Sequence, residues 1–230
     1  MLRIGVVSFP GSNCEEETLR AARLVGAEAV AIWHRDTTLG GADVVILPGG
    51  FSYGDYLRAG AIARFSPVMA AIRRHADAGG AVIGICNGFE ILCEAGLLPG
   101  ALMRNAGLHY QSRPVDVRIE RADTIVTRAY RAGQVIRIPI GHGDGRYVAP
   151  PDVLAALEAD GRVVLRYAGR ALDAPANPNG AMADIAAICN PAGTVVGMMP
   201  HPERLADARL GSDVGLGVFH SIAASFADAA

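Results

Sequence analysis

The sequence contains no lysine, so all 21 residues counted as lysine or arginine are arginine. This absence excludes the lysine of a phosphate-binding P-loop, lysine Schiff-base chemistry and a lysine general base. The P-loop pattern GxxxxGK[ST] is missing as well. Any ATP-driven reaction that the protein serves would therefore need a nucleotide site of another kind.

Charge of one sign and long hydrophobic runs are also lacking. The net charge is −2, and acidic and basic residues are scattered, which argues against a nucleic-acid or anionic-membrane partner. No apolar stretch approaches the roughly 20 residues that span a bilayer. The N-terminal segment 1–12 has one arginine and a short apolar run, as expected of a strand rather than a signal peptide.

Cysteine is scarce, and no two cysteines form a CxxC pair; the four are Cys14, Cys86, Cys93 and Cys189. Their spacing favours reduced cysteines in a cytoplasmic protein over a disulfide framework, and it gives no metal-ligand pattern. By contrast, 51% of the residues are apolar, which predicts a sizeable core. No linker or repeat interrupts the chain, so we expect a single domain over residues 1–230.

The first hundred residues alternate between short apolar runs and helical patterns. We predict strands at 3–8, 28–33, 43–47 and 81–85, and helices at 15–26, 67–78 and 86–95. The second helix is expected to begin with Ser66 as its N-cap and Pro67 in its first turn. Short apolar strands separated by helices are typical of a parallel sheet covered on both faces.

After residue 100 the rhythm changes to strand-like pieces joined by turns. These pieces lie at 115–119, 134–140, 162–167, 182–189 and 194–200. They predict an antiparallel extension of the sheet, followed by a helix that Ser212 and Asp213 cap and that runs through Phe226. The predicted fold class is α/β, with a mainly parallel central sheet and helices on both faces.

Cys86 lies in the segment GICNGFEIL (84–92), between a predicted strand and a predicted helix. Open α/β sheets place their ligand crevices at this end of a parallel strand, and a helix N-terminus lowers the pKa of a thiol. Gly84 and Gly88 leave room for a sharp turn, as in the nucleophile elbow of hydrolases. From this segment alone, a nucleophile and a buried filler cysteine remain equal alternatives.

Cys14 also follows a strand and opens a helix. Three glutamates, at 15–17, come next and oppose formation of a thiolate. Ser12 and Glu15 resemble a capping box, which gives this loop a structural explanation. We therefore predict that Cys14 is structural.

A nucleophilic thiol needs a base, and the segment MMPHPER (198–204) offers one. His201 stands two residues before Glu203, and Pro202 favours an extended conformation at His201, so both side chains face the same way. Glu203 can then accept a hydrogen bond from the imidazole and leave the other ring nitrogen for Cys86. The alternative is a surface turn with an incidental ion pair; the presence of the elbow favours catalysis.

Acyl transfer also needs donors for an oxyanion. The Gly-Gly turn of LPGG (47–50) follows a predicted strand, so the backbone N–H groups of Gly50 and Asn87 could form a two-donor hole. We also assign Gly49, Phe51, Glu90 and His142 to the substrate side of the cleft. For His142, in GHGDGRY (141–147), a surface loop is an equal alternative.

Taken together, these residues resemble class I (triad) glutamine amidotransferases, a family with a Gly-x-Cys-x-Gly elbow, a late His-x-Glu pair and a Gly-Gly oxyanion loop. The chain resembles in particular the glutaminase subunits of phosphoribosylformylglycinamidine synthase, the PurQ type. Six segments across nearly the whole chain carry this similarity: FPGSNCEEE (9–17), LPGGFSYGDYLRAGAIA (47–63), GICNGFEIL (84–92), PIGHGDGRY (139–147), NPNG (177–180) and GMMPHPER (197–204).

The resemblance implies a flavodoxin-like fold and hydrolysis of L-glutamine to glutamate and ammonia. It also implies that the ammonia passes to a synthetase that converts formylglycinamide ribonucleotide to formylglycinamidine ribonucleotide with ATP. In such systems ATP and Mg belong to a PurL-type partner, which works with a small PurS-type subunit. We therefore expect no cofactor in this chain.

One residue departs from the family pattern. At position 90, where the elbow usually continues Gly-x-Gln, the chain has Glu, one helical turn after Cys86. A carboxylate there should disfavour the thiolate. Either an arginine such as Arg58 or Arg113 pairs with Glu90, or the binding of glutamine is altered.

Two other functions compete with this interpretation. A cysteine peptidase or hydrolase of the DJ-1/PfpI kind shares the strand–Cys–helix elbow, but the late His-x-Glu pair and the segment 47–63 argue against it. A non-catalytic, amidotransferase-like binding module is expected to lack a member of the triad, and here all three residue types are present.

Overall fold

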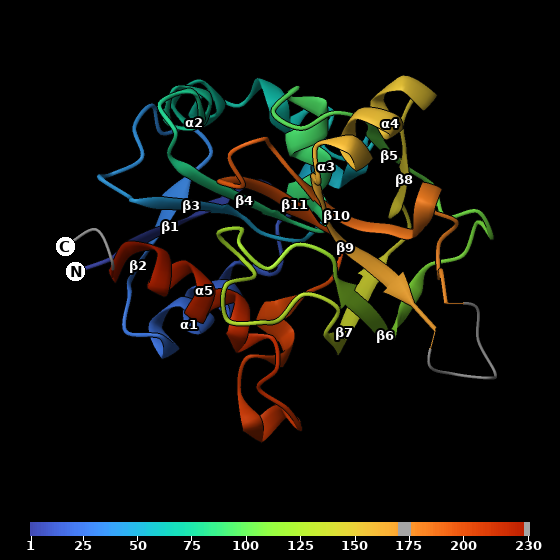
Figure 1. Cartoon of the computed structure of the whole chain (residues 1–230). Helices are drawn as coiled ribbons and strands as arrows, with labels where there is room; N and C mark the ends of the chain where they lie inside the picture. Colours follow the sequence, from blue (N-terminus) through green and yellow to red (C-terminus); the bar gives the residue numbers. More distant parts are fainter. Residues whose placement is uncertain (170–175, 228–230) are drawn as a thin grey trace.

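A twisted sheet runs through the centre of the computed structural model, which describes residues 1–169 and 176–227 (Figure 1). Within these ranges the sheet has nine strands in the order β2-β1-β3-β4-β11-β10-β9-β6-β7. Their bounds, in chain order, are β1 Arg3–Ser8, β2 Glu28–Trp33, β3 Val44–Leu47, β4 Ala81–Ile85, β6 Gln111–Ile119, β7 Val135–His142, β9 Val163–Ala168, β10 Ile185–Cys189 and β11 Val195–Met198. The strands β5 (Ala101–Met103) and β8 (Arg146–Val148) form a separate pair.

The sheet divides into a parallel and an antiparallel half. Strands β1 and β2, β1 and β3, β3 and β4, and β4 and β11 pair in parallel. Beyond β11, the ladders through β10, β9, β6 and β7 are antiparallel. The order β2-β1-β3-β4-β11 matches the flavodoxin-like arrangement 2-1-3-4-5. The predicted α/β class, with an antiparallel extension in the second half, is confirmed.

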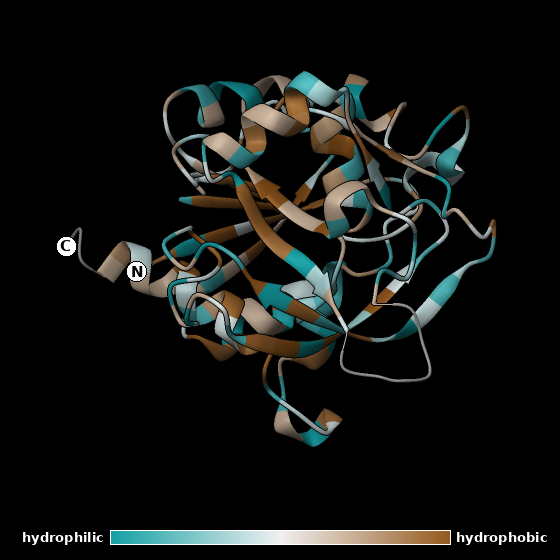
Figure 2. Ribbon diagram, turned by 45° about the vertical axis from the view of Figure 1, so that its right-hand side comes forward, coloured by the Kyte–Doolittle hydropathy of each residue, from teal (hydrophilic) through white to brown (hydrophobic). Residues whose placement is uncertain are grey.

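Helices cover both faces of the parallel half (Figure 1). The helices α2 (Val68–Asp77) and α3 (Asn87–Glu94) lie on one face, and α1 (Glu15–Leu24) and α5 (Leu216–Ala227) lie on the other. Because both faces are covered, every residue of β3 and β4 is buried. Brown, hydrophobic residues are accordingly prominent in the strands at the centre of the sheet in Figure 2.

Several local predictions need correction. Helix α4 (Pro151–Ala159) was not expected, and only Leu157 among its residues is fully buried, so its apolar pattern is weak. Ser66 does not cap α2, because its hydroxyl bonds to that of Tyr53 and Pro67 takes the N-cap position. The last helix begins at Leu216, later than a cap at Ser212 or Asp213 would place it.

The capping box expected at the start of α1 does not form either. The hydroxyl of Ser12 accepts from the backbone N–H of Phe9, and the Glu15 carboxylate accepts from the hydroxyl of Ser8. Cys14 takes the N-cap position without a side-chain cap. The 3-10 segments are η1 Ser52–Asp55, η2 Ala63–Phe65, η3 Met182–Asp184, η4 Pro202–Leu205 and η5 Ala208–Leu210. Among the described residues, no helix combines the length and apolarity that crossing a membrane requires.

Gly197 in β11 lets helix α3 lie flat on the sheet. A Cβ atom at this position would lie 2.0 Å from Cδ2 of Phe89, a fully buried ring. We expect Gly197→Ala to lower the free energy of unfolding by about 1–3 kcal/mol, the usual cost of overpacking a core. Chemical denaturation of the variant beside the wild-type chain measures the difference.

Gly107→Ala is the matched control, because a Cβ atom at that exposed position meets nothing within 4 Å. Its stability should stay within about 0.5 kcal/mol of the wild-type value. Equal stabilities for the two variants would show that Gly197 is not needed for the packing of α3.

Candidate active site

Cys86 occupies a strained turn between β4 and α3. Its backbone has φ 51° and ψ −109°, in the left-handed half of the map that a residue with a Cβ rarely adopts. Such an outlier between a strand and a helix is the geometry of a nucleophile elbow. The side chain is buried, and its Sγ lies 3.6 Å from the carbonyl oxygen of Gly141.

The two glycines of the elbow allow close backbone packing. A Cβ atom at Gly84 would lie 2.5 Å from the carbonyl oxygen of Gly88. One at Gly88 would lie 1.9 Å from the carbonyl oxygen of Leu47, at the end of β3. The start of α3 therefore presses directly on β3, and this contact sets the elbow beside the loop that follows β3.

His201 comes from the neighbouring strand. Strand β11 pairs with β4 in parallel, with Met198 opposite Ile85, so the residues after both strands lie at the same edge of the sheet. The backbone N–H of Cys86 donates to the carbonyl of Met198 at 2.7 Å, and the N–H of His201 donates to the carbonyl of Pro139 at 2.9 Å. The first bond joins the elbow to the end of β11, and the second holds His201 against β7.

His201 and Glu203 form a buried pair. Nδ1 of His201 lies 2.5 Å from Oε1 of Glu203, and both side chains are almost completely inaccessible to water. Nε2 of His201 is buried and has no hydrogen-bond partner among the described residues. A Cβ atom on Gly141 would lie 4.0 Å from this Nε2, so the same glycine contacts the thiol of Cys86 and faces the free ring nitrogen.

Burial raises the pKa of the Cys86 thiol well above its ordinary value, and the nearby acidic side chains of Glu90 and Glu203 raise it further. The backbone N–H of Asn87 donates to the sulfur and lowers the pKa, but this effect is smaller. The resting residue is therefore a neutral thiol. For the sulfur to act as a nucleophile, a base would have to take its proton, and Nε2 of His201 is the ring nitrogen without a partner among the described residues.

The Gly49–Gly50 peptide lies beside His201. A Cβ atom on Gly49 would be 2.6 Å from Cε1 of the His201 ring, so only glycine fits. The carbonyl of Gly49 accepts hydrogen bonds from the backbone N–H groups of Asn13 and Cys14, each at 3.3 Å. In a trans peptide the N–H points opposite to the carbonyl, so the N–H of Gly50 is directed away from helix α1.

Cys14 lies closer to His201 than the sequence indicated. Its Sγ is 4.0 Å from Nδ1 of His201 and accepts a hydrogen bond from the Arg204 guanidinium at 3.0 Å. Burial, with a smaller contribution from Glu203, raises the pKa of Cys14 to about 12. The thiol is thus neutral, as predicted, but it flanks His201. The three glutamates that follow it gave no indication of this contact.

The other residues assigned to the substrate side differ in their surroundings. Phe51 is half exposed, and its ring centroid lies 6.4 Å from that of Tyr110, a residue that the sequence analysis did not single out. His142 is buried rather than in a surface loop, with its Nδ1 3.1 Å from Oδ1 of Asn105. Burial and the neighbouring His201 lower the pKa of His142 to about 4, so it is neutral at physiological pH.

Glu90 has no arginine partner among the described residues. Its Oε2 accepts from the side-chain amide of Asn87 at 2.6 Å, and the same amide reaches Oδ1 of Asp55 at 3.3 Å. Arg58, which the sequence offered as a partner, pairs with Glu94 instead. Burial raises the pKa of Glu90 well above its ordinary value, and it raises that of Asp55 to about 6. A protonated Glu90 is neutral and carries an O–H donor, which makes it a close chemical substitute for glutamine.

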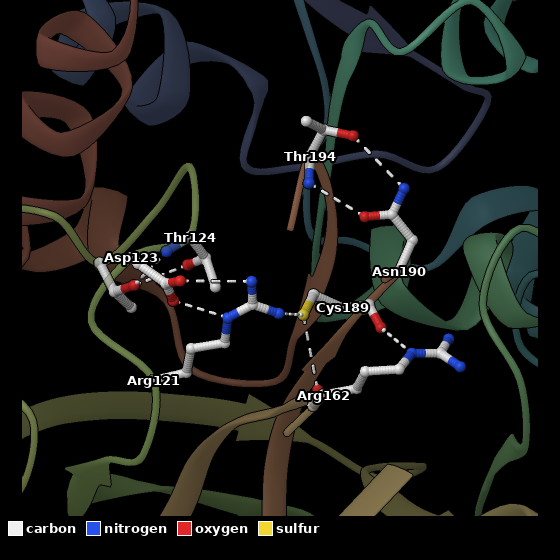
Figure 3. A network of polar contacts seen from close by, with 8 residues as sticks. Arg121, Asp123, Thr124, Arg162, Cys189, Asn190 and Thr194 are labelled. Carbon is white, nitrogen blue, oxygen red and sulfur yellow. Dashed lines mark hydrogen bonds and ion pairs between the residues drawn. The ribbon is translucent and has the colours of Figure 1, made fainter. Parts of the chain in front are cut away.

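The two remaining cysteines, Cys93 and Cys189, lie apart from the His201–Glu203 pair. Cys93 is buried in α3, with its Sγ directed to the carbonyl of Pro99. Cys189, which had no evident partner in the sequence, belongs to a polar network at the end of β10 (Figure 3). Its Sγ accepts from Arg121 at 3.5 Å, and its carbonyl accepts from Arg162 at 2.9 Å. Both cysteines have structural surroundings.

Comparison with known proteins identifies the family. The model of the CobB/CobQ-like glutamine amidotransferase domain matches residues 1–214. The chain belongs to the glutamine amidotransferase family. Its strained Cys86 elbow and buried His201–Glu203 pair lie within the residues that this family model covers.

Similar amidotransferases are found in several bacteria. Over 228 residues, the chain is 58% identical to the phosphoribosylformylglycinamidine synthase subunit PurQ of Frankia casuarinae, covering 99% of this chain and 95% of that protein. The subunit of the same name from Thermus thermophilus is 55% identical over 218 residues, with coverage of 95% and 96%. A chain in the structure of PurLQS from Thermotoga maritima superposes with a TM-score of 0.88 at 41% identity, over 98% of this chain and 99% of that one.

Glu90 provides a test of the electrostatics of this amidotransferase site. At low pH Glu90 is protonated, so Glu90→Gln should leave the glutaminase rate nearly unchanged. As the pH rises through the raised pKa of Glu90, the wild-type residue becomes a carboxylate beside the Cys86 sulfur and disfavours the thiolate. The ratio of variant to wild-type kcat/KM should therefore increase with pH, as pH–rate profiles of the two proteins would show.

Glu94→Gln is the matched control for this profile, because Glu94 lies on the same helix but pairs with Arg58. The ratio of its kcat/KM to that of the wild-type protein should not vary with pH. A large loss of kcat/KM in Glu90→Gln at every pH would show that the carboxylate has a role of its own in the reaction.

Proposed function

We propose that this chain is the glutaminase subunit of a phosphoribosylformylglycinamidine synthase, with Cys86, His201 and Glu203 as its catalytic triad. The observation that carries the proposal is the buried His201–Glu203 pair at the same sheet edge as the strained Cys86 elbow. The near full-length similarity to PurQ subunits supports the choice among amidotransferases.

In the first half of the reaction, Nε2 of His201 takes the proton of the Cys86 thiol as Sγ attacks the side-chain amide carbon of glutamine. The backbone N–H groups of Gly50 and Asn87 hold the resulting oxyanion. His201 then returns the proton to the amide nitrogen, which leaves as ammonia, and a glutamyl thioester remains on Cys86. Glu203 fixes the ring by accepting from Nδ1–H throughout.

In the second half, Nε2 of His201 takes a proton from water, and the hydroxide oxygen attacks the thioester carbon. The carbon–sulfur bond breaks, glutamate leaves, and the proton returns to the sulfur. Gly49, Phe51, Glu90 and His142 belong to the substrate side of the cleft in this scheme. Phe51 is the member of this group that is open to solvent at the entrance.

The ammonia serves a partner synthetase of the PurL type, assembled with a small PurS-type subunit, in the cytoplasm. The presence of a similar chain in the structure of PurLQS supports this partnership. That partner uses ATP and Mg to convert formylglycinamide ribonucleotide to formylglycinamidine ribonucleotide, and the present chain needs no cofactor of its own. We further propose that residues 1–230 act as one amidotransferase domain.

The rival functions have less support. A DJ-1/PfpI-type hydrolase shares the elbow, but the family model and the PurQ relatives favour amide transfer. A non-catalytic binding module has no need of a strained elbow cysteine at the sheet edge that also carries a fully buried His–Glu pair.

Removal of the nucleophile tests the proposal. In the assembled synthetase, Cys86→Ala should lower glutamine-dependent synthesis by more than about 10³-fold, because the covalent route is lost. Synthesis from added ammonia should stay at the wild-type rate, since the ammonia-using site lies in the partner. Steady-state assays with each nitrogen source measure both rates, and His201→Ala should behave in the same way.

Cys189→Ala is the control, because it removes a buried thiol that lies opposite Val196, at the other end of β11 from the Cys86 elbow. Its rates of glutamine-dependent and ammonia-dependent synthesis should both remain close to the wild-type rates. If glutamine-dependent synthesis survives Cys86→Ala, the proposed mechanism is wrong; if the wild-type chain cleaves peptides but not glutamine, the assigned function is wrong.

A further inference from the structure

A second set of ligand atoms surrounds His201 on its Nδ1 edge, away from the ring nitrogen that serves Cys86. Cys14, His201 and Glu203 each place one ligand atom within 4.8 Å of the other two. All three side chains are at least 97% buried. In the scheme above, the reaction uses His201 and Glu203 but has no role for Cys14.

Two of these groups keep unused lone pairs. Oε2 of Glu203 is buried and has no hydrogen-bond partner among the described residues. The Sγ of Cys14 accepts from Arg204 and is 4.0 Å from Nδ1 of His201, too far for a strong bond to the ring. A thiol, an imidazole and a carboxylate in one buried cluster are the donor types that a borderline-soft cation such as Zn²⁺ prefers.

The geometry points to an inhibitory site for a thiophilic divalent cation of the Zn²⁺ or Cd²⁺ type, with Cys14, His201 Nδ1 and Glu203 as its ligands. Zinc binds sulfur at about 2.3 Å and nitrogen at about 2.05 Å, so tetrahedral S and N ligands stand about 3.6 Å apart. The observed separation of 4.0 Å needs only a small closure. The Glu203 carboxylate must move away from Nδ1, because the cation replaces the hydrogen bond between them.

A cavity gives the cation a route that avoids the Cys86 elbow. Its lining includes Glu17 and Arg20 of helix α1 together with Glu203 and Arg204. Arg204 forms one wall, and its guanidinium donates to Cys14, so its movement into this cavity would release the sulfur. The cation then takes the place of the guanidinium as the positive partner of the thiolate.

Binding at Nδ1 would disable the base without blocking the elbow. The Cys14 thiol loses its proton to solvent when sulfur binds the cation. The proton on Nδ1 of a neutral His201 must leave that nitrogen, and the ring keeps it by taking the tautomer with hydrogen on Nε2. Nε2 then has no lone pair to receive the proton of Cys86. This inhibitory consequence rests on the proposed function, whereas binding of the cation does not.

Cd²⁺ titration of full-length variants tests the binding site through the ultraviolet charge-transfer absorption of the cadmium–thiolate bond. The Cys86→Ser variant should keep this absorption, since Cys14 remains. The double variant Cys86→Ser/Cys14→Ser should lose it, and Cys86→Ser/Cys189→Ser, the matched control, should keep it. Circular dichroism verifies that each variant is folded.

The outcomes separate the alternatives. Absorption that is lost in Cys86→Ser but kept in Cys14→Ser would place the cation on the nucleophile and overturn the proposal. Absorption that persists in the double variant lacking Cys14 and Cys86, or that is absent from the wild-type chain, would overturn it too.

Inhibition provides the second measurement. In the assembled synthetase, Zn²⁺ should inhibit glutamine-dependent synthesis, and a chelator should reverse this inhibition. Ammonia-dependent synthesis should be unaffected by Zn²⁺. Cys14→Ser should raise the inhibitory Zn²⁺ concentration by more than about tenfold, since even indirect partners of a metal commonly contribute 10–100-fold to its affinity. An unchanged inhibitory concentration would overturn the inhibitory role. Absence of metal-free glutaminase activity would instead refute the proposed function and leave the cadmium result standing.

Discussion

Strands β4 and β11 pair in parallel at the centre of the sheet, and the positions of Cys86 and of the segment that carries His201 depend on that ladder. Gly84 faces Gly197 and Ile85 faces Met198 across it. The pairing continues beyond the strands through the bond from the Cys86 N–H to the Met198 carbonyl. A shift of this register by one residue would reverse the faces of the side chains that follow, and Cys86 would no longer meet the segment that carries His201.

The strain at Cys86 is sustained by close backbone contacts around it. Gly88 lies so near the Leu47 carbonyl that no side chain fits, and Gly84 packs against Gly88 in turn. The same closeness brings the loop after β3 to the elbow, where Gly49 contacts the His201 ring. One packing constraint therefore accounts for the strained turn at Cys86 and for the nearness of the Gly49–Gly50 loop.

The sequence was sufficient for the parts of the fold that local patterns determine. Uniformly apolar runs such as AVIGI predicted buried parallel strands, and the spacing of His201 and Glu203 predicted their pairing. The sequence was insufficient where tertiary contacts determine which hydrogen bonds and side-chain contacts a residue makes. Ser66 has the residue type of a helix cap, yet its hydroxyl bonds to that of Tyr53, 13 residues earlier in the chain. Cys14 meets His201 only because α1 docks beside η4, which no local pattern reveals.

In the proposed mechanism, the burial of Cys86, His201 and Glu203 keeps the site inactive until substrate arrives. Burial raises the pKa of Cys86 and lowers that of His142, so both groups rest in their neutral forms. Separation of a thiolate from an imidazolium in these surroundings is costly because charge is poorly solvated there. An amide that enters supplies a carbonyl on which the negative charge can develop, beside the Asn87 N–H. Proton transfer to His201 therefore becomes favourable only together with attack, and the burial that suppresses a free thiolate couples the nucleophile to its substrate.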